Sequence, residues 1–407
     1  MSDHESQATN HKSRYKVSGF LFSGISIGIK KDGARDLGLI YSEVPAQVAG
    51  LFTTNAVKAA PVQIDMERIK RGVCQAVIVN SGNANACTGS QGLKDARRVS
   101  SLLAKQLGIN ENRVLLSSTG IIGVPLPVKT IEEAVPELVE ALSPEAWMKT
   151  VESIMTTDAF PKVEAAECRI EGKRVKLCGM VKGAGMICPN LATMLSFLIT
   201  DANIQASLLR WMLQQAGEES FNRITVDGET STNDTVLLLA NGKADHSLLY
   251  REDRRAEMFL SMLSEICQEL AKKVVKDGEG ATKFVDILVK GARNREDAKK
   301  AAYTIAHSPL VKTAFFGEDA NWGRVLSALG HSGIKMNPNR VDVFFDKFPI
   351  VKGGMGIGGQ YEEKAGHVLK KRSYQVIIDL HQGKNQFSVF TTDLSIDYVK
   401  INASYRS

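Results

Sequence analysis

Helix-like and strand-like patterns are mixed along the whole of this 407-residue chain. The i, i+3, i+4, i+7 spacing of apolar residues predicts amphipathic helices over residues 95–108, 130–142, 206–222 and 256–276. Apolar runs of strand length predict β-strands over residues 75–82, 113–120, 193–200, 234–242, 284–291, 340–346 and 373–380. Because the two kinds of element do not alternate regularly, we expect a layered α/β or α+β sandwich rather than a doubly wound sheet.

The composition is that of a globular protein without a nucleic-acid footprint. With 43% hydrophobic residues the chain can bury one large core or two medium ones. The net charge of +6 is modest, and the basic pairs are scattered without interleaved aromatic residues. We therefore expect no nucleic-acid partner.

Cysteine usage and hydropathy point to the cytoplasm. The six cysteines form no C-x-x-C pair and the histidines no metal-ligand spacing, so we expect free thiols, a reducing compartment and no metal. No apolar run reaches the roughly 18 residues of a membrane-spanning helix, so no membrane association is expected. Residues 1–15 are polar and lack the apolar core of a signal peptide, which predicts a disordered tail.

Two glycine-containing motifs are superficial matches to known chemistry. The run from Gly353 to Gly359 lacks the Lys-Ser/Thr of a P-loop, and a polar segment rather than a helix start is expected after it, so a hairpin connection is predicted. Ser81-Gly82 does not fit a G-x-S-x-G elbow. Asn83, Asn85 and Thr88 follow a predicted strand, where either a turn or a site would use them.

Two further loops carry polar groups that have both a structural and a chemical interpretation. Thr119-Gly120 ends a predicted strand and has the hydroxyl and N–H of an oxyanion hole, although such turns are common. Thr156, Thr157 and Asp158 in "MTTDAFPK" fit a helix cap or a turn.

Acidic residues beside glycines form another such group. Glu229, Asp234 and Glu279 stand in loops where acids would meet a cationic amine, whereas tight turns would also explain the Asp-Gly pairs. The oxygen-ligand spacing of a calcium loop is absent from both loops.

The stretch "PNLATMLSFL" at residues 189–198 follows a glycine-rich loop. Thr193 either begins a buried strand or serves as a nucleophile. Gly183 and Gly185 would permit the strained backbone of an N-to-O acyl shift, and cleavage before Thr193 would place a hydroxyl and a free amine on one residue. Lys182 would lower the pKa of that amine. The residues alone leave both interpretations open.

A series of motifs in one order resembles those of the ornithine acetyltransferases (glutamate N-acetyltransferases) of arginine biosynthesis. The resemblance spans nearly the whole chain, at residues 24–62, 77–89, 117–123, 154–162, 179–202, 224–235, 276–284, 315–330 and 391–407, with "ATML" at the centre. It implies an α-β-β-α sandwich of the kind shared by these enzymes and self-processing aminopeptidases.

The resemblance also implies self-cleavage between Ala192 and Thr193. After the tail, the products would be an α chain of residues 16–192 and a β chain of residues 193–407, and an α2β2 heterotetramer is expected. Thr193 matches the family's nucleophile, and Thr119 and Gly120 match its oxyanion pair. The matched substrate-binding positions are Thr156, Thr157, Lys182, Thr193, Glu279, Asn402 and Ser407. The family often ends in Thr where this chain has Ser407, which keeps the hydroxyl and the carboxylate.

The implied reaction moves an acetyl group from N-acetylornithine to glutamate, giving ornithine and N-acetylglutamate through an acetyl-Thr193 ester. Two half-reactions sharing one intermediate predict ping-pong kinetics. No cofactor is required, and use of acetyl-CoA as a second donor stays open. Two alternatives remain: a Thr-dependent amidohydrolase or aminopeptidase in which water resolves the ester, and an uncleaved metabolite-binding protein.

Overall fold

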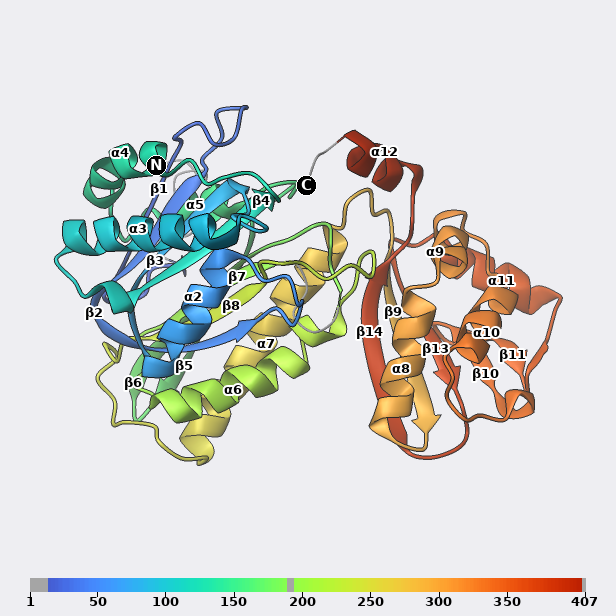
Figure 1. Ribbon diagram of the computed structural model, residues 1–407. Coiled ribbons are helices and arrows are strands. Elements are labelled where there is room, and N and C mark those ends of the chain that lie inside the picture. Colours follow the sequence, from blue (N-terminus) through green and yellow to red (C-terminus); the bar gives the residue numbers. More distant parts are fainter. Residues whose placement is uncertain (1–13, 189–193, 405–407) are drawn as a thin grey trace, which may run out of the picture.

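The structure, a computed structural model, describes residues 14–188 and 194–404. Two β-sheets form its framework, with helices packed on their faces (Figure 1). Within the described residues the first sheet has eight strands in the order β4-β3-β2-β8-β7-β6-β5, with β1 paired to β2. The second has six strands in the order β12-β11-β10-β13-β9-β14.

The first unit comprises residues up to the end of α7. Its strands are β1 (Phe20–Ile25), β2 (Leu37–Phe52), β3 (Val73–Asn83), β4 (Val114–Ile121), β5 (Lys162–Ile170), β6 (Lys173–Lys182), β7 (Leu195–Thr200) and β8 (Thr235–Ala240). Its helices are α2 (Ala60–Arg68), α3 (Gly89–Leu107), α4 (Val128–Glu140), α5 (Trp147–Ile154), α6 (Ala206–Glu218) and α7 (Arg254–Lys276).

Strand β2 connects the two halves of the first sheet. Its first part pairs with β1 and β3, and its last part, from Gln47 to Phe52, pairs with β8. The register shifts between Tyr41 and Ala46, where the extra residues interrupt the ladder to β3. Such an irregularity bends and twists a strand, so one long strand can serve two sheet halves.

A buried core fills the space between these halves. Phe22 of β1 and Val77 of β3 meet Phe197 of β7 and Leu237 of β8 in one cluster. Because side chains alternate along a strand, the intervening residues lie on the outer faces. There α3 and α4 pack on one half, and α6 and α7 on the other. The order helix, sheet, sheet, helix confirms the α-β-β-α class.

Helix α7 shows how local sequence and packing agree. Asp253 caps it, accepting hydrogen bonds from the N–H groups of Arg255 (2.9 Å) and Ala256 (3.1 Å), an arrangement that stabilises a helix by about 1 kcal/mol. Phe259 and Leu270 belong to the buried face that packs on the sheet. The helix ends beside the loop that carries Glu279.

The second unit follows α7. Its strands are β9 (Phe284–Ala292), β10 (Asp342–Phe345), β11 (Phe348–Lys352), β12 (Met355–Gly356), β13 (Ser373–Asp379) and β14 (Asn385–Thr392). Its helices are α8 (Arg295–Ala306), α9 (Pro309–Phe316), α10 (Trp322–His331) and α11 (Gln360–Leu369). Strand β9 runs parallel to β13 and antiparallel to β14. After β14, α12 (Ile396–Ser404) leaves this unit and lies at the top of the view in Figure 1.

All four predicted helices and all seven predicted strands are present, with shifts at their ends. The helix expected over 206–222 ends at Glu218, and a short 3-10 helix at Phe221–Arg223 follows it. The hairpin expected in the glycine run is confirmed, because Gly353 and Gly354 connect β11 to β12 with φ of 56° and 77°. The expectation that no helix follows is wrong: α11 begins at Gln360, directly after Gly359.

Tyr15 was expected in the disordered tail, and the structure corrects this. Tyr15 is buried and its ring stacks on Trp147 of α5 at a centroid distance of 5.7 Å. Its aromatic side chain belongs to the core between the sheet halves, which the polar composition around it concealed. None of the described helices combines the length and apolar character needed to cross a bilayer.

Candidate active site

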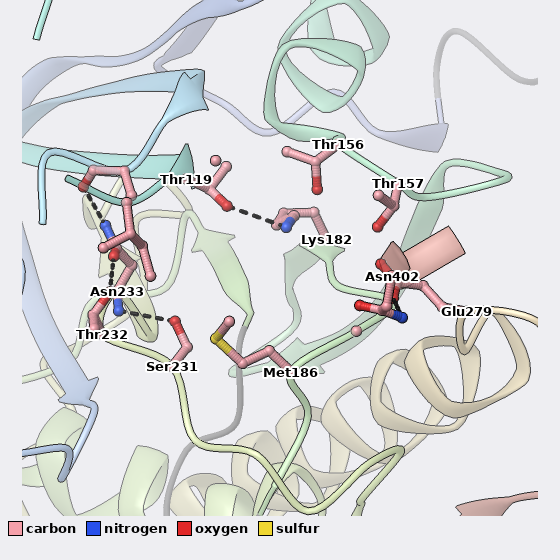
Figure 2. A pocket seen from close by; sticks show the side chains of 14 residues that line it. Thr119, Thr156, Thr157, Lys182, Met186, Ser231, Thr232, Asn233, Glu279 and Asn402 are labelled. Carbon is pink, nitrogen blue, oxygen red and sulfur yellow. Dashed lines mark hydrogen bonds between the residues drawn. The ribbon is translucent and has the colours of Figure 1, made fainter. Parts of the chain in front are cut away.

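A pocket lies at the ends of several strands of the first sheet, and seven of the predicted site residues line it (Figure 2). These are Thr119, Gly120, Thr156, Thr157, Lys182, Glu279 and Asn402. They come from β4, the loop after α5, the end of β6, the loop after α7 and α12. The predicted residues Ala192, Thr193 and Ser407 lie outside the described residues.

Lys182 is the buried cation of the pocket. Alternation along β6 places Cys178 and Met180 in the core between the sheet halves, and Lys182 continues that face where the strand ends. Its Nζ donates a hydrogen bond to Thr119 Oγ1 at 3.2 Å. Burial lowers the pKa of Lys182 because it destabilises the ammonium, and Asp158 opposes that change.

Thr119 and Gly120 end β4 opposite Lys182. Because the Thr119 oxygen accepts from Lys182, its own O–H is available to donate into the pocket. Gly120 has φ of +132°, and a Cβ there would lie 2.3 Å from the backbone carbon of Gly82. The close approach of the β3 and β4 ends therefore requires glycine at this position.

A loop before β8 supports this strand end, and sequence reasoning missed it. Asn233 Nδ2 donates to the carbonyl oxygens of Ser118 (2.8 Å) and Ala84 (2.7 Å). The first bond holds the peptide that joins Ser118 to Thr119. Ser231, Thr232 and Asn233 line the pocket beside Met186. The sequence signal for these three residues is the polar run "TSTND" at residues 230–234, of which only Asp234 was predicted as a site candidate.

Glu279 faces the pocket from the other side, with Asn402 against it (Figure 2). Asn402 Nδ2 donates to Glu279 Oε2 at 2.9 Å, so α12 closes on the loop after α7. The Glu279 N–H donates to Ala184 O at 2.9 Å, which fixes the loop beside Gly185. The pocket thus presents an ammonium and a carboxylate to one ligand, the pair that would bind an amino acid as a zwitterion.

The other two candidate acids do not line the pocket. Glu229 is exposed in a turn, with its N–H bonded to Asp227 Oδ1. Asp234 is buried, and its Oδ1 accepts the Met194 N–H at 3.1 Å. Burial raises the pKa of Asp234 well above its ordinary value. Its contact is to the residue that follows Thr193 in the chain.

Asn83, Asn85 and Thr88 serve the turn rather than the pocket. Asn83 Nδ2 donates to the carbonyls of residues 124 and 125, and Asn85 Nδ2 to that of Gly92. Thr88 Oγ1 donates to Asn85 Oδ1 at 2.8 Å. Ala84, between the two asparagines, lines the pocket instead.

The fold and the pocket define an α-β-β-α enzyme scaffold whose pocket presents one buried lysine and one glutamate. The family profile described as the ArgJ family matches residues 21–407, and the chain belongs to that family. This confirms the resemblance to the ornithine acetyltransferases and the expectation of an acyltransferase of arginine biosynthesis.

A curated relative agrees with this membership, and two solved structures are also similar to parts of the chain. The arginine biosynthesis bifunctional protein ArgJ of Geobacter sulfurreducens is 51% identical over 391 residues, covering 96% of this chain and 100% of the relative. A crystal structure of the Bacillus halodurans ArgJ protein is 40% identical, covers 51% of this chain and 98% of that chain, and has a TM-score of 0.49. A Mycobacterium tuberculosis ornithine acetyltransferase solved with ornithine is 32% identical, covers 45% and 95%, and has a TM-score of 0.39.

Proposed function

We propose that this protein transfers the acetyl group of N-acetylornithine to glutamate through an ester on Thr193. The observation that carries the proposal is the single pocket in which Thr119, Gly120, Lys182 and Glu279 meet. The hydroxyl and backbone donors needed for an oxyanion stand with one cation and one anion that would orient an amino acid.

The proposed sequence begins with hydrolysis of the peptide bond between Ala192 and Thr193, in which water supplies the oxygen of the new Ala192 carboxylate and the proton of the new amine. The new amine of Thr193, whose ordinary pKa is about 8, accepts the proton of its own hydroxyl. Oγ attacks the acetyl carbonyl, forming a C–O bond and a tetrahedral oxyanion that Thr119 and Gly120 stabilise. The C–N bond then breaks, and the leaving amine takes the proton and departs as ornithine.

In the second half-reaction the amine of glutamate attacks the ester. The N–C bond forms, the ester C–O bond breaks, and Thr193 regains its hydroxyl as N-acetylglutamate leaves. We assign Lys182 to the substrate carboxylate and Glu279 to a substrate amine. Thr156, Thr157, Asn402 and Ser407 would complete the substrate site. No metal or organic cofactor enters these steps, because the ester forms on the protein's own side chain.

The sheet topology supports association of the two chains after cleavage. Strands β6 and β7 flank the proposed cleavage point and are antiparallel neighbours, with Lys182 opposite Leu195. Strand β7 also pairs with β8, so the new chain would begin beside an internal strand. An α2β2 assembly in the cytoplasm completes the proposal, and the six cysteines, all free thiols in the structure, fit a reducing compartment.

A denaturing gel and an acetyl-transfer assay test the proposal together. Purified protein should give two bands of about half length, and Thr193→Ala should give one full-length band. Transfer from N-acetylornithine to glutamate should fall at least about 1,000-fold in that variant, as expected for loss of a nucleophile.

The alternatives have their own readouts. Acetate release that glutamate does not suppress would identify a hydrolase, and an uncleaved wild-type protein without transfer activity would identify a binding protein. N-acetylglutamate formed from acetyl-CoA and glutamate alone would establish the second donor.

A further inference from the structure

Asp158 is a buried carboxylate that joins two segments of the active site. Its side chain is 0% exposed. Oδ2 accepts the N–H of Thr156 at 2.9 Å, and Oδ1 accepts the N–H of Gly183 at 2.8 Å. Thr156 belongs to the loop after α5, and Gly183 directly follows Lys182 at the end of β6. One side chain therefore sets the position of the threonine loop relative to the lysine.

A second acid lies behind Asp158 and makes a useful comparison. Lys162, also fully buried, forms ion pairs with both Asp158 and Asp277. Asp277 accepts the N–H of Ala159 at 3.1 Å, which is its own link to the same loop. Neither acid lines the pocket, but the hydrogen bonds of Asp277 reach neither Thr156 nor Gly183. Both acids therefore pair with Lys162, and Asp158 in addition bonds the backbone of Thr156, a pocket residue, and of Gly183, the neighbour of Lys182.

The charge of Asp158 acts on Lys182. The charged groups that influence the Lys182 ammonium are Asp158, Lys162, Glu279 and Asp234, and among them Asp158 has the largest effect. Burial alone would raise the pKa of Asp158, but Lys182 and then Lys162 oppose this, and the resulting pKa is about 2. Burial raises the pKa of Asp277 instead. Lys182 and Lys162 thus both favour the charged form of Asp158.

We propose that Asp158 is a positioning residue for the reaction, holding the Thr156–Thr157 loop against the end of β6 and supplying the buried counter-charge of the Lys182 ammonium. The inference rests on the proposed function, in which Lys182 binds the substrate carboxylate. A buried ammonium without its counter-charge is costly, so loss of Asp158 would turn Lys182 toward its neutral form and weaken its hold on an anionic substrate.

The test compares Asp158→Asn with Asp277→Asn in the self-processed enzyme that contains both cleavage products. Both changes keep the side-chain shape, and each removes one of the two carboxylates that pair with Lys162. We expect kcat/KM for N-acetylornithine at pH 7 to fall at least about tenfold in Asp158→Asn. We also expect the alkaline limb of its pH profile to move about one pH unit lower, because the ammonium loses its proton more readily. In Asp277→Asn that limb should keep its wild-type position.

A double variant keeps the test decisive where Asp158→Asn alone fails to fold. If Asp158 acts through Lys182, adding Asp158→Asn to Lys182→Met should cost little further activity. It should also restore soluble protein, because the double variant no longer buries a Lys182 ammonium without its counter-charge, while Lys162 keeps its ion pair with Asp277. Insoluble protein from both variants, or equal pH profiles for Asp158→Asn and Asp277→Asn, would overturn the proposal. The wild-type enzyme is assayed first. Absence of acetyl transfer in the wild type would refute the proposed function itself, and this outcome is distinct from a failure of the Asp158 proposal.

Discussion

The Glu279 carboxylate lies against the backbone of Gly185, so closely that a Cβ on Gly185 would stand 2.4 Å from Oε2. The contact is with the end of a flexible side chain, which can move aside. Gly185→Ala is therefore expected to displace the carboxylate and to raise KM for N-acetylornithine about tenfold, with the fold retained. Steady-state kinetics and a thermal melt measure the two effects.

Gly366→Ala is the matched control for this change, because a Cβ at Gly366 in α11 would contact nothing within 4 Å. Its KM should equal that of the wild type. A wild-type KM in Gly185→Ala would show that the carboxylate position is not needed for binding.

Removing the charge of Glu279 tests its proposed role more directly. Glu279→Gln keeps an oxygen for the hydrogen bond from Asn402 but loses the negative charge that would face a substrate amine. A hydrogen bond to a charged group contributes about 1.5–3 kcal/mol, so KM for N-acetylornithine should rise tenfold or more. Glu229→Gln, an exposed acid outside the pocket, should leave KM unchanged. An unchanged KM in Glu279→Gln would remove the amine-binding assignment.

Gly120 tests the oxyanion assignment through its backbone. Gly120→Ala would bring a Cβ within 2.3 Å of the Gly82 backbone, so the ends of β3 and β4 must separate. We expect kcat to fall at least about 100-fold, because the donors move from the oxyanion position. Gly123→Ala is the control: it carries similar strain, with φ of +81°, but a Cβ there would meet no atom within 4 Å. Similar losses of kcat in both variants would attribute the effect to strain alone.

The buried His307 is expected to make the free energy of unfolding depend on pH. Burial, and then the charge of Lys312, lowers the pKa of His307 to about 4. Between about pH 6.5 and 4 the unfolded chain binds a proton that the folded protein does not, so the free energy of unfolding should decrease as the pH falls, by up to about 1.4 kcal/mol per pH unit. Urea unfolding at pH 7, 6 and 5 measures this slope. The slope should be smaller in His307→Gln, and an equal slope would contradict the prediction.

Much of the local structure was predictable because its signals are local. Helix α7 has its cap and its apolar face within one continuous segment, and the β11–β12 turn has two adjacent glycines that adopt positive φ. The site residues Thr119, Lys182 and Glu279 were found through motifs, each of which is a short continuous stretch. The loop at Ser231–Asn233 escaped notice because its polar residues also fit an ordinary turn.

Sequence by itself determined the fold class, the family and most of the residues of the site, since periodicity, glycine positions and motif order are properties of the chain. Only the tertiary structure decided which of them act together. The hydrogen bond from Lys182 to Thr119 joins residues on different strands, and Asp158 meets Asp277 through Lys162 across more than a hundred positions. These contacts exist because folding brings strand ends and loops to one place, and burial there strengthens the effect of each charge on its neighbours.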